Sequence, residues 1–206
     1  MVDEQKYDGL LVPTERYLES GIHIGTKIKT GDTKDFIFKK RRDRIYIIDL
    51  KKIDDGIRNA LEVLKKYDVK DILIVATRMY AINASRKLKQ MLDIETVEKR
   101  FVPGTFTNKE SKHFKEPEIV LVCDPRNEKE AIREANMMNI PVIGLVDTDN
   151  TTRGLDVVIP MNNKGRKSLA LFFWILAREL LLKEGKIKSY DEFKLPITYF
   201  ERLEIE

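Results

Sequence analysis

Short apolar runs rich in β-branched residues alternate along this chain with segments of helical period, and this alternation limits the possible folds more than any other feature. Runs of this kind are typical of strands buried on both faces. Helices between successive strands imply parallel pairing with right-handed crossovers. The expected strands are Ile72–Ala76, residues 96–102, Ile119–Val122, Val142–Val146 and residues 157–159. The sequence therefore predicts an α/β protein with one mainly parallel five-stranded sheet.

The segments around these strands carry the apolar spacing and end signals of helices. The expected helices are Thr14–Ser20 with Thr14 as N-cap and Gly21 as stop, residues 49–67, residues 77–92 with Thr77 as cap, a helix from Asp124-Pro125 to about Asn139, and residues 165–184 before Gly185. The last of these is apolar nearly all round, so we expect it to be buried on more than one side.

A strongly basic segment near the N-terminus is predicted to form a β-hairpin, with strands at 36–38 and 44–48 around a tip at 39–43. Its eight basic residues face three acids (8 − 3 = +5), whereas the whole chain carries only +4. The aromatic residues Phe36, Phe38 and Tyr46 recur at strand period, so we expect them to pack inward. The eight are Lys27, Lys29, Lys34, Lys39, Lys40, Arg41, Arg42 and Arg44.

Composition restricts the class of protein. At 206 residues the chain is long enough for one domain that folds without a disulfide or a metal, and its single cysteine, Cys123, is predicted to be a buried, inert thiol. Residues 1–11 are polar, so no secretory signal is expected. The apolar stretch 169–182 contains Arg178 and Glu179 and is too short for a membrane span. A cytoplasmic protein without a membrane association is therefore expected.

Nucleotide-binding motifs are lacking in this sequence. The segment 21–27 (GIHIGTK) misses the spacing and the Lys-Ser/Thr order of a phosphate-binding loop. No glycine follows the strand Ile72–Ala76, as a dinucleotide site would require. Asp147 and Asp149 could hold Mg²⁺ at a strand end, but no lysine is evident at a matched strand end, so a structural role is favoured. We expect no catalytic residue, cofactor or metal; a Mg²⁺- or nucleotide-binding enzyme or switch is the alternative.

Two further basic clusters accompany the hairpin. One surrounds the loop 103–108, and the other lies where the last helix begins, a position whose backbone N–H groups favour phosphate. Charge without base-reading motifs indicates contacts to the backbone of a folded RNA, although a solvated surface would explain the hairpin charges equally well. The additional candidates are Arg78, Arg100, Asn108, Lys109, Lys112, Lys115, Lys164, Arg166 and Lys167.

Seven motifs, found in order, resemble the family of the second protein of the small ribosomal subunit. They are residues 17–26 (YLESGIHIGT), 46–50 (YIIDL), 100–108 (RFVPGTFTN), 124–126 (DPR), 140–142 (IPV), 147–150 (DTDN) and 159–168 (IPMNNKGRKS). The resemblance covers about Tyr7 to Gly185, and the last motif is similar to the archaeal and eukaryotic branch. Bacterial members carry a helical hairpin after the 100–108 motif, whereas only residues 109–116 stand here. The acidic tail of the eukaryotic member is also missing.

The resemblance implies a flavodoxin-like three-layer fold without catalytic activity. It also implies binding to small-subunit ribosomal RNA and to neighbouring ribosomal proteins near the junction of head and body, with no obligate homo-oligomer. We expect one ribosomal-protein domain, divided into an N-terminal arm with the hairpin (1–48), an α/β core (49–185) and a C-terminal extension (186–206). A protein-interaction scaffold outside the ribosome remains a third possibility.

Overall fold

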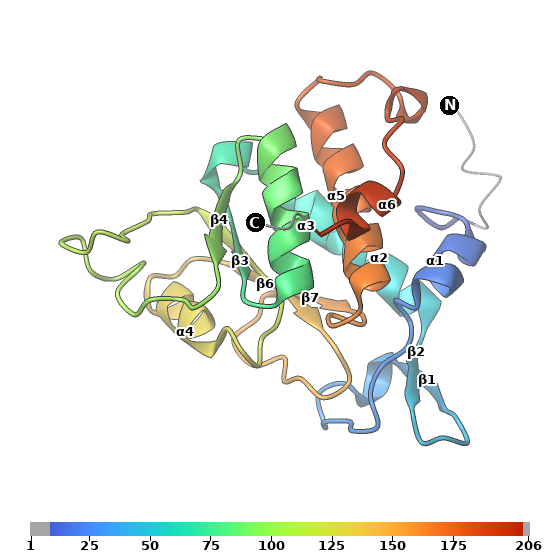
Figure 1. Ribbon diagram of the computed structural model, residues 1–206. Helices are drawn as coiled ribbons and strands as arrows, with labels where there is room; N and C mark the ends of the chain where they lie inside the picture. Colours follow the sequence, from blue (N-terminus) through green and yellow to red (C-terminus); the bar gives the residue numbers. More distant parts are fainter. Residues whose placement is uncertain (1–8, 204–206) are drawn as a thin grey trace.

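The computed structural model describes residues 9–203 of the chain (Figure 1). The start of the resemblance at Tyr7, and residues 1–8 and 204–206 of the two expected extensions, lie outside this range. Within it, the main sheet has five strands in the order β4-β3-β5-β6-β7, all paired in parallel. This order is that of flavodoxin-like folds, so the predicted fold class is confirmed. The strands are β3 (Ile72–Ala76), β4 (Glu95–Glu98), β5 (Ile119–Val122), β6 (Val142–Val146) and β7 (Val157–Pro160).

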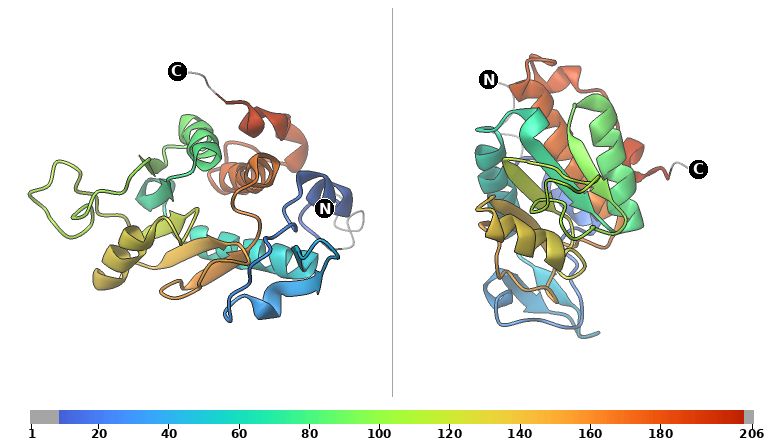
Figure 2. Two further views of the ribbon diagram at one scale, coloured as in Figure 1. Left: turned by 60° about the horizontal axis from the view of Figure 1, so that its bottom comes forward. Right: turned by 90° about the vertical axis from the view of Figure 1, so that its left-hand side faces the viewer.

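Helices cover both faces of this sheet (Figures 1 and 2). Residues that alternate along the strands divide between two apolar clusters: Ile74 and Leu121 pack with α3 (Met79–Met91) and α5 (Arg166–Lys183), whereas Val75 and Val122 pack with α4 (Lys129–Met137). The crossovers β4–β5 and β6–β7 are loops instead of helices. The helix α5 is buried nearly all round, as predicted, because α3, α6 (Thr198–Glu201) and the C-terminal segment pack over it.

The helix α2 (Leu50–Leu64) packs along the edge strand β7. Gly56 permits this close approach, since a Cβ there would lie 2.8 Å from Pro160 Cδ and 3.0 Å from the Val158 carbonyl oxygen. Asp54 of α2 is buried and accepts hydrogen bonds from the Tyr17 hydroxyl (2.7 Å) and the Leu11 amide (2.8 Å). These bonds fasten α1 (Thr14–Ser20) and the segment before it to the core.

The basic hairpin consists of β1 (Ile37–Lys40) and β2 (Tyr46–Ile48), which pair antiparallel and project away from the main sheet (Figure 1). The inner side of β2 pairs with residues 23–26: Gly25 N donates to the Tyr46 carbonyl (3.0 Å), and Tyr46 N donates to the Thr26 carbonyl (2.9 Å). The two-stranded hairpin is thus bonded along β2 to an extended segment that carries an isolated bridge from Ile24 to Ile47. The described chain also contains the 3₁₀ turns Lys34–Phe36, Val69–Asp71 and Tyr190–Glu192.

Several expected boundaries were wrong. Neither Thr14 nor Thr77 caps a helix. Thr14 is the first residue inside α1. Thr77 bonds instead to Glu128, so at this position a tertiary contact replaces the local cap. The helix expected at Asp124-Pro125 begins only at Lys129, because residues 124–128 form a turn. The strand β4 ends at Glu98, where Lys99 takes a positive φ of 62°. The expected stops at Gly21, Asn139 and Gly185 all have left-handed φ values.

None of the helices within residues 9–203 combines the length and the apolar character needed to cross a bilayer.

Candidate nucleic-acid interface

A network of buried polar side chains fills the carboxyl edge of the sheet, where flavodoxin-like proteins bind ligands. At its centre the Glu128 carboxylate accepts bonds from the Thr77 amide, the Thr77 hydroxyl and the Asp124 amide, each 3.0 Å long. It therefore joins the ends of β3 and β5. Burial raises the pKa of Glu128 to about 8, because desolvation of the charged form outweighs these hydrogen bonds.

Arg78, a predicted RNA contact, belongs to this network. Its guanidinium lies 2.6 Å from the carboxylate of Asp124, which is fully buried, and Asn150 Nδ2 donates to the same carboxylate (3.3 Å). The charge of Arg78 is therefore largely neutralised within the protein, and the side chain is about one-third exposed. Its geometry holds the β3 and β5 ends together.

Lys164 lies between the two acids that were considered as a Mg²⁺ site. Its Nζ is 2.8 Å from Asp147 and 2.6 Å from Asp149. The expectation that no lysine matches this pair was wrong: Lys164 follows β7, the neighbour of β6, and its ammonium occupies the place that a cation would need. Burial raises the pKa of Asp147 in spite of the ion pair. Within the described residues, no group of three or more His, Cys, Asp or Glu side chains is arranged to hold a metal ion.

The loop after β6 is fixed from both sides. Asn163 Nδ2 donates to the Leu145 carbonyl (2.8 Å) and to Asn150 Oδ1 (3.0 Å), and Asn150 Oδ1 also accepts from the Asp147 amide (2.8 Å). The 147–150 and 159–168 motifs thus meet in a single network, in which Asn150 and Asn163 serve as scaffold.

The base of the basic segment docks on this same loop. Thr148 accepts a bond from the Thr26 amide through its hydroxyl (2.9 Å) and one from the Thr33 hydroxyl through its carbonyl (2.9 Å), and Thr30 Oγ1 donates to the Asn150 carbonyl (2.7 Å). A Cβ on Gly25 would lie only 2.5 Å from Thr148 Cγ2. The hairpin is therefore anchored to the sheet edge through the loop 25–33.

The hairpin presents its cations to solvent. All eight predicted basic residues between Lys27 and Arg44 are exposed, and the ion pair that the structure gives them is Arg41–Asp43 (3.0 Å). Lys29 and Lys40 lie over the Tyr46 ring, at 5.5 and 5.3 Å from its centroid. At the tip, Arg41 N donates to the Ile45 carbonyl and Arg44 N to the Arg41 carbonyl, with Arg44 at φ 70°. Arg41, Arg42 and Arg44 thus stand on a hydrogen-bonded turn.

The prediction that the hairpin aromatics all pack inward was wrong for Phe38, which is 65% exposed. The strand β1 has a bulge between Ile37 and Lys39, so Phe38 departs from the alternation that the prediction assumed. Phe36 precedes the strand and packs against the main core, as expected, and Tyr46 is half-buried.

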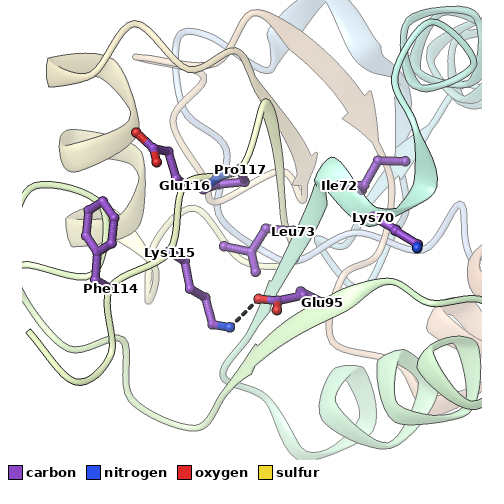
Figure 3. A pocket seen from close by; sticks show the side chains of 8 residues that line it. All are labelled: Lys70, Ile72, Leu73, Glu95, Phe114, Lys115, Glu116 and Pro117. Atoms are coloured by element: carbon purple, nitrogen blue, oxygen red, sulfur yellow. Dashed lines mark hydrogen bonds and ion pairs between the residues drawn. The ribbon is translucent and has the colours of Figure 1, made fainter. Parts of the chain in front are cut away.

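The loop at residues 100–115 lies beyond β4, at the edge of the sheet opposite to the hairpin (Figures 1 and 2). Arg100, Asn108, Lys109 and Lys112 are exposed there. Lys115 is half-buried and reaches Glu95 on β4 in an ion pair (Figure 3). The structure therefore does not bring this cluster together with the hairpin.

The third cluster lies where α5 begins, with Arg166 and Lys167 exposed and Lys164 engaged as described. Arg166 approaches Glu201 of α6 at 3.8 Å.

Sequence reasoning missed Arg126 and Glu134. Arg126 follows β5, its side chain is 62% exposed, and one guanidinium nitrogen lies 3.4 Å from the Asp149 carboxylate. The sequence signal that could have identified it is the 124–126 motif. Glu134 accepts bonds from the Gly104 (2.5 Å) and Phe106 (2.9 Å) amides and holds the 103–108 loop on α4. No local pattern marks Glu134, because its partners lie about thirty residues away.

Comparison with known proteins supplies the family. The model of the family described as Ribosomal protein S2 matches residues 17–116 and 110–181. Small ribosomal subunit protein uS2 of Thermoplasma volcanium is 45% identical over 192 residues, covering 93% of this chain and 96% of the relative. The protein of the same name from Thermoplasma acidophilum is 44% identical over equal shares. That of Methanococcus maripaludis is 44% identical over 191 residues, or 90% of this chain and 86% of the relative.

These relatives are archaeal, in agreement with the branch that the 159–168 motif indicates. Their names support a structural role in the small ribosomal subunit. With the family model covering most of the chain and the flavodoxin-like sheet in place, the protein belongs to the ribosomal protein S2 family.

Proposed function

We propose that this chain is a non-catalytic structural constituent of the small ribosomal subunit that binds ribosomal RNA mainly through phosphate contacts. It would also contact neighbouring ribosomal proteins near the junction of head and body, in ribosomes of the cytoplasm and without an obligate homo-oligomer. In this proposal residues 1–206 act as one ribosomal-protein domain, made of the arm, the core and the C-terminal extension.

The observation that carries the proposal is the set of exposed cations on the hairpin and the loop that anchors it. Eight basic side chains are exposed on a segment that is hydrogen-bonded to the sheet edge, and Asp43 is the acid that the structure pairs with one of them. This anchored segment, in which Arg41 pairs with Asp43 and the other cations remain exposed, offers phosphates a preorganised partner, because binding then costs little backbone conformational entropy.

The proposed RNA contacts fall into two groups. The exposed group would touch phosphate directly, whereas the half-buried, ion-paired residues Arg78, Lys115 and Lys164 would support the surface from beneath. The exposed group comprises Lys27, Lys29, Lys34, Lys39, Lys40, Arg41, Arg42, Arg44, Arg100, Asn108, Lys109, Lys112, Arg166 and Lys167.

The test replaces three hairpin cations, as Lys40→Ala, Arg42→Ala and Arg44→Gly in one variant. Glycine is chosen at position 44 because it tolerates the positive φ of 70°, so the charge is removed without backbone strain. The matched control, Lys66→Ala, Lys89→Ala and Lys188→Ala, removes the same charge from exposed sites away from the hairpin.

The measurement is competition between tagged variant and wild type for incorporation into small subunits, read on sucrose gradients of host lysate. We expect the hairpin variant to be under-represented about tenfold and the control variant to match wild type, with both melting temperatures unchanged. Equal incorporation of wild type, the hairpin variant and the control variant would exclude the hairpin as an RNA contact. A wild-type protein that stays at the top of the gradient would overturn the ribosomal role itself.

A further inference from the structure

A groove with a volume of about 790 Å³ opens between α1, the hairpin and the start of α2. Apolar side chains from all three elements line it: Leu18 from α1, Phe38 and Ile47 from the hairpin, and Leu50 from α2. Ile48, which is buried, completes the floor. Leu18, Phe38 and the segment 47–50 are separate in sequence, and the docking of the hairpin brings them together.

Two large apolar side chains of this groove face solvent in the free protein. Leu18 is 49% exposed and Phe38 is 65% exposed. The bulge in β1 takes Phe38 out of the inward alternation of the strand. Adjacent exposed apolar side chains of this size are typical of a surface that is covered by a partner.

The rim of the groove is cationic. Lys39, Arg41 and Lys51 line it with one acid, Asp49 (3 − 1 = +2), and Arg41 also pairs with Asp43, which lies outside the lining. The Asp49 carboxylate is already engaged, since it accepts the Lys51 amide (2.9 Å) as the N-cap of α2. The rim therefore favours carboxylates on the occupant.

We propose that this groove binds a segment of a neighbouring protein that inserts one or two large apolar or aromatic side chains and carries Asp or Glu on either side of them. The proposal rests on the proposed function for the presence of that neighbour. It identifies the groove as the contact and assigns the chemistry of the occupant.

A protein segment suits this floor better than RNA does. Leu18, Ile47, Ile48 and Leu50 are aliphatic and offer no hydrogen-bonding groups for base edges, and the lining residues that carry a ring are Phe38 and His23. The four aliphatic side chains do offer surface for a buried anchor, the usual centre of a protein–protein contact. Lys39 and Arg41 line the groove, whereas Lys40, Arg42 and Arg44 do not, so RNA contacts made by the latter three are separable from occupancy of the groove.

The experiment introduces the photo-cross-linking residue p-benzoylphenylalanine in place of Phe38 in the full-length protein expressed in its host. The control carries the same residue at Met137, an exposed apolar position on α4. Cells are irradiated, lysates are fractionated on sucrose gradients, and the cross-linked segment is identified by mass spectrometry.

The expected result is one dominant adduct from position 38, to a protein segment with an apolar or aromatic residue between acidic residues, in the small-subunit fraction. An adduct to ribosomal RNA, to a second copy of this chain, or to a segment without acidic residues would overturn the proposal. So would the absence of any adduct specific to position 38. Co-sedimentation with the subunit is read from the same gradients, so a failed groove and a failed ribosomal role give different patterns.

A second variant tests the anchor contacts without the photo-reactive group at position 38. Leu18→Ser with Phe38→Ser should leave the protein in the small subunit but lower the yield of a cross-link placed at Lys51 at least tenfold, whereas Met137→Ser should leave that yield unchanged. Equal yields from both variants would show that the apolar side chains do not hold the occupant.

Discussion

Gly25 shows how a single residue determines the docking of the basic segment. Its Cα faces Thr148 on the loop after β6, in a gap that holds no further carbon atom. Thr148 is buried and accepts bonds from both sides of this contact, so it cannot move aside freely. Gly25, the second glycine of the 17–26 motif, is therefore explained by close approach, since its φ is not in the left-handed region.

Gly25→Ala should lower the free energy of unfolding by about 1–3 kcal/mol, because the new methyl group overpacks the contact. Its Cβ would lie 2.5 Å from Thr148 Cγ2 and 3.0 Å from the Tyr46 carbonyl oxygen. Adding Thr148→Ser removes Cγ2 but keeps the hydroxyl that accepts the Thr26 amide, so part of the stability should be restored. Urea unfolding of the single and double variants measures the coupling, and strictly additive effects would contradict the explanation.

Glu128 gives the stability of the protein a dependence on pH. Its pKa rises from 4.5 to about 8 on folding. At pH values between these two, the native state therefore holds a proton that the unfolded state has lost. The contribution of this group is fully present below pH 4.5 and is lost as the pH rises through about 8. The free energy of unfolding of wild type should therefore fall relative to that of Glu128→Gln across this window, as measured by urea unfolding at several pH values. A constant difference would show that the carboxyl does not titrate there.

At the scale of elements, the approach of α2 to β7 depends on one glycine inside a helix. Helix propensity alone would make Gly56→Ala stabilising by about 1 kcal/mol. The Cβ would, however, meet the Pro160 ring at 2.8 Å and the Val158 carbonyl at 3.0 Å, and neither is the end of a flexible side chain. Packing therefore outweighs propensity.

We expect Gly56→Ala to lower the free energy of unfolding by about 1–2 kcal/mol, since the overpacking cost exceeds the propensity gain. Asn59→Ala, at an exposed position of the same helix, serves as the control and should be neutral or slightly stabilising. Thermal and urea unfolding measure both. A stabilised Gly56→Ala protein would show that α2 can shift away from β7.

The basic elements differ in how much charge they leave available. The hairpin keeps its cations exposed, whereas the carboxyl edge neutralises Arg78 and Lys164 through Asp124, Asp147 and Asp149. Basic residues that were predicted together thus differ in environment: those of the hairpin are exposed, whereas Arg78 and Lys164 are ion-paired and half-buried.

At the scale of the whole molecule, the proposed binding to phosphate predicts how affinity responds to salt. Removing one cation that pairs with a phosphate should reduce the slope of log K against log salt by roughly 0.7–0.9, so the three-cation hairpin variant should show a slope shallower by roughly 2–3. Equilibrium binding to small subunits depleted of this protein, measured at several salt concentrations, tests this. A variant with wild-type slope but weaker binding would indicate that the substitutions act through folding.

Much of the molecule can be predicted from the sequence, because the decisive information is local. Period and β-branching place four of the five main strands to within one residue, and glycine or asparagine mark the stops at Gly21, Asn139 and Gly185. The concentration of charge between Lys27 and Arg44 is visible without a structure. The ordered motifs are sufficient to identify the family, which comparison confirms.

Tertiary structure alone decided the rest, because it depends on contacts between residues far apart in the chain. The ion pairs of Lys164 with Asp147 and Asp149 join the ends of neighbouring strands, and no spacing rule predicts which cation an acid will capture. Thr77 bonds to Glu128, 51 residues away, in preference to capping its own helix. The bulge that leaves Phe38 exposed arises from the pairing of β1 with β2. Sequence determines where polar and apolar groups lie along the chain, and only folding determines which of them remain unpartnered at the surface.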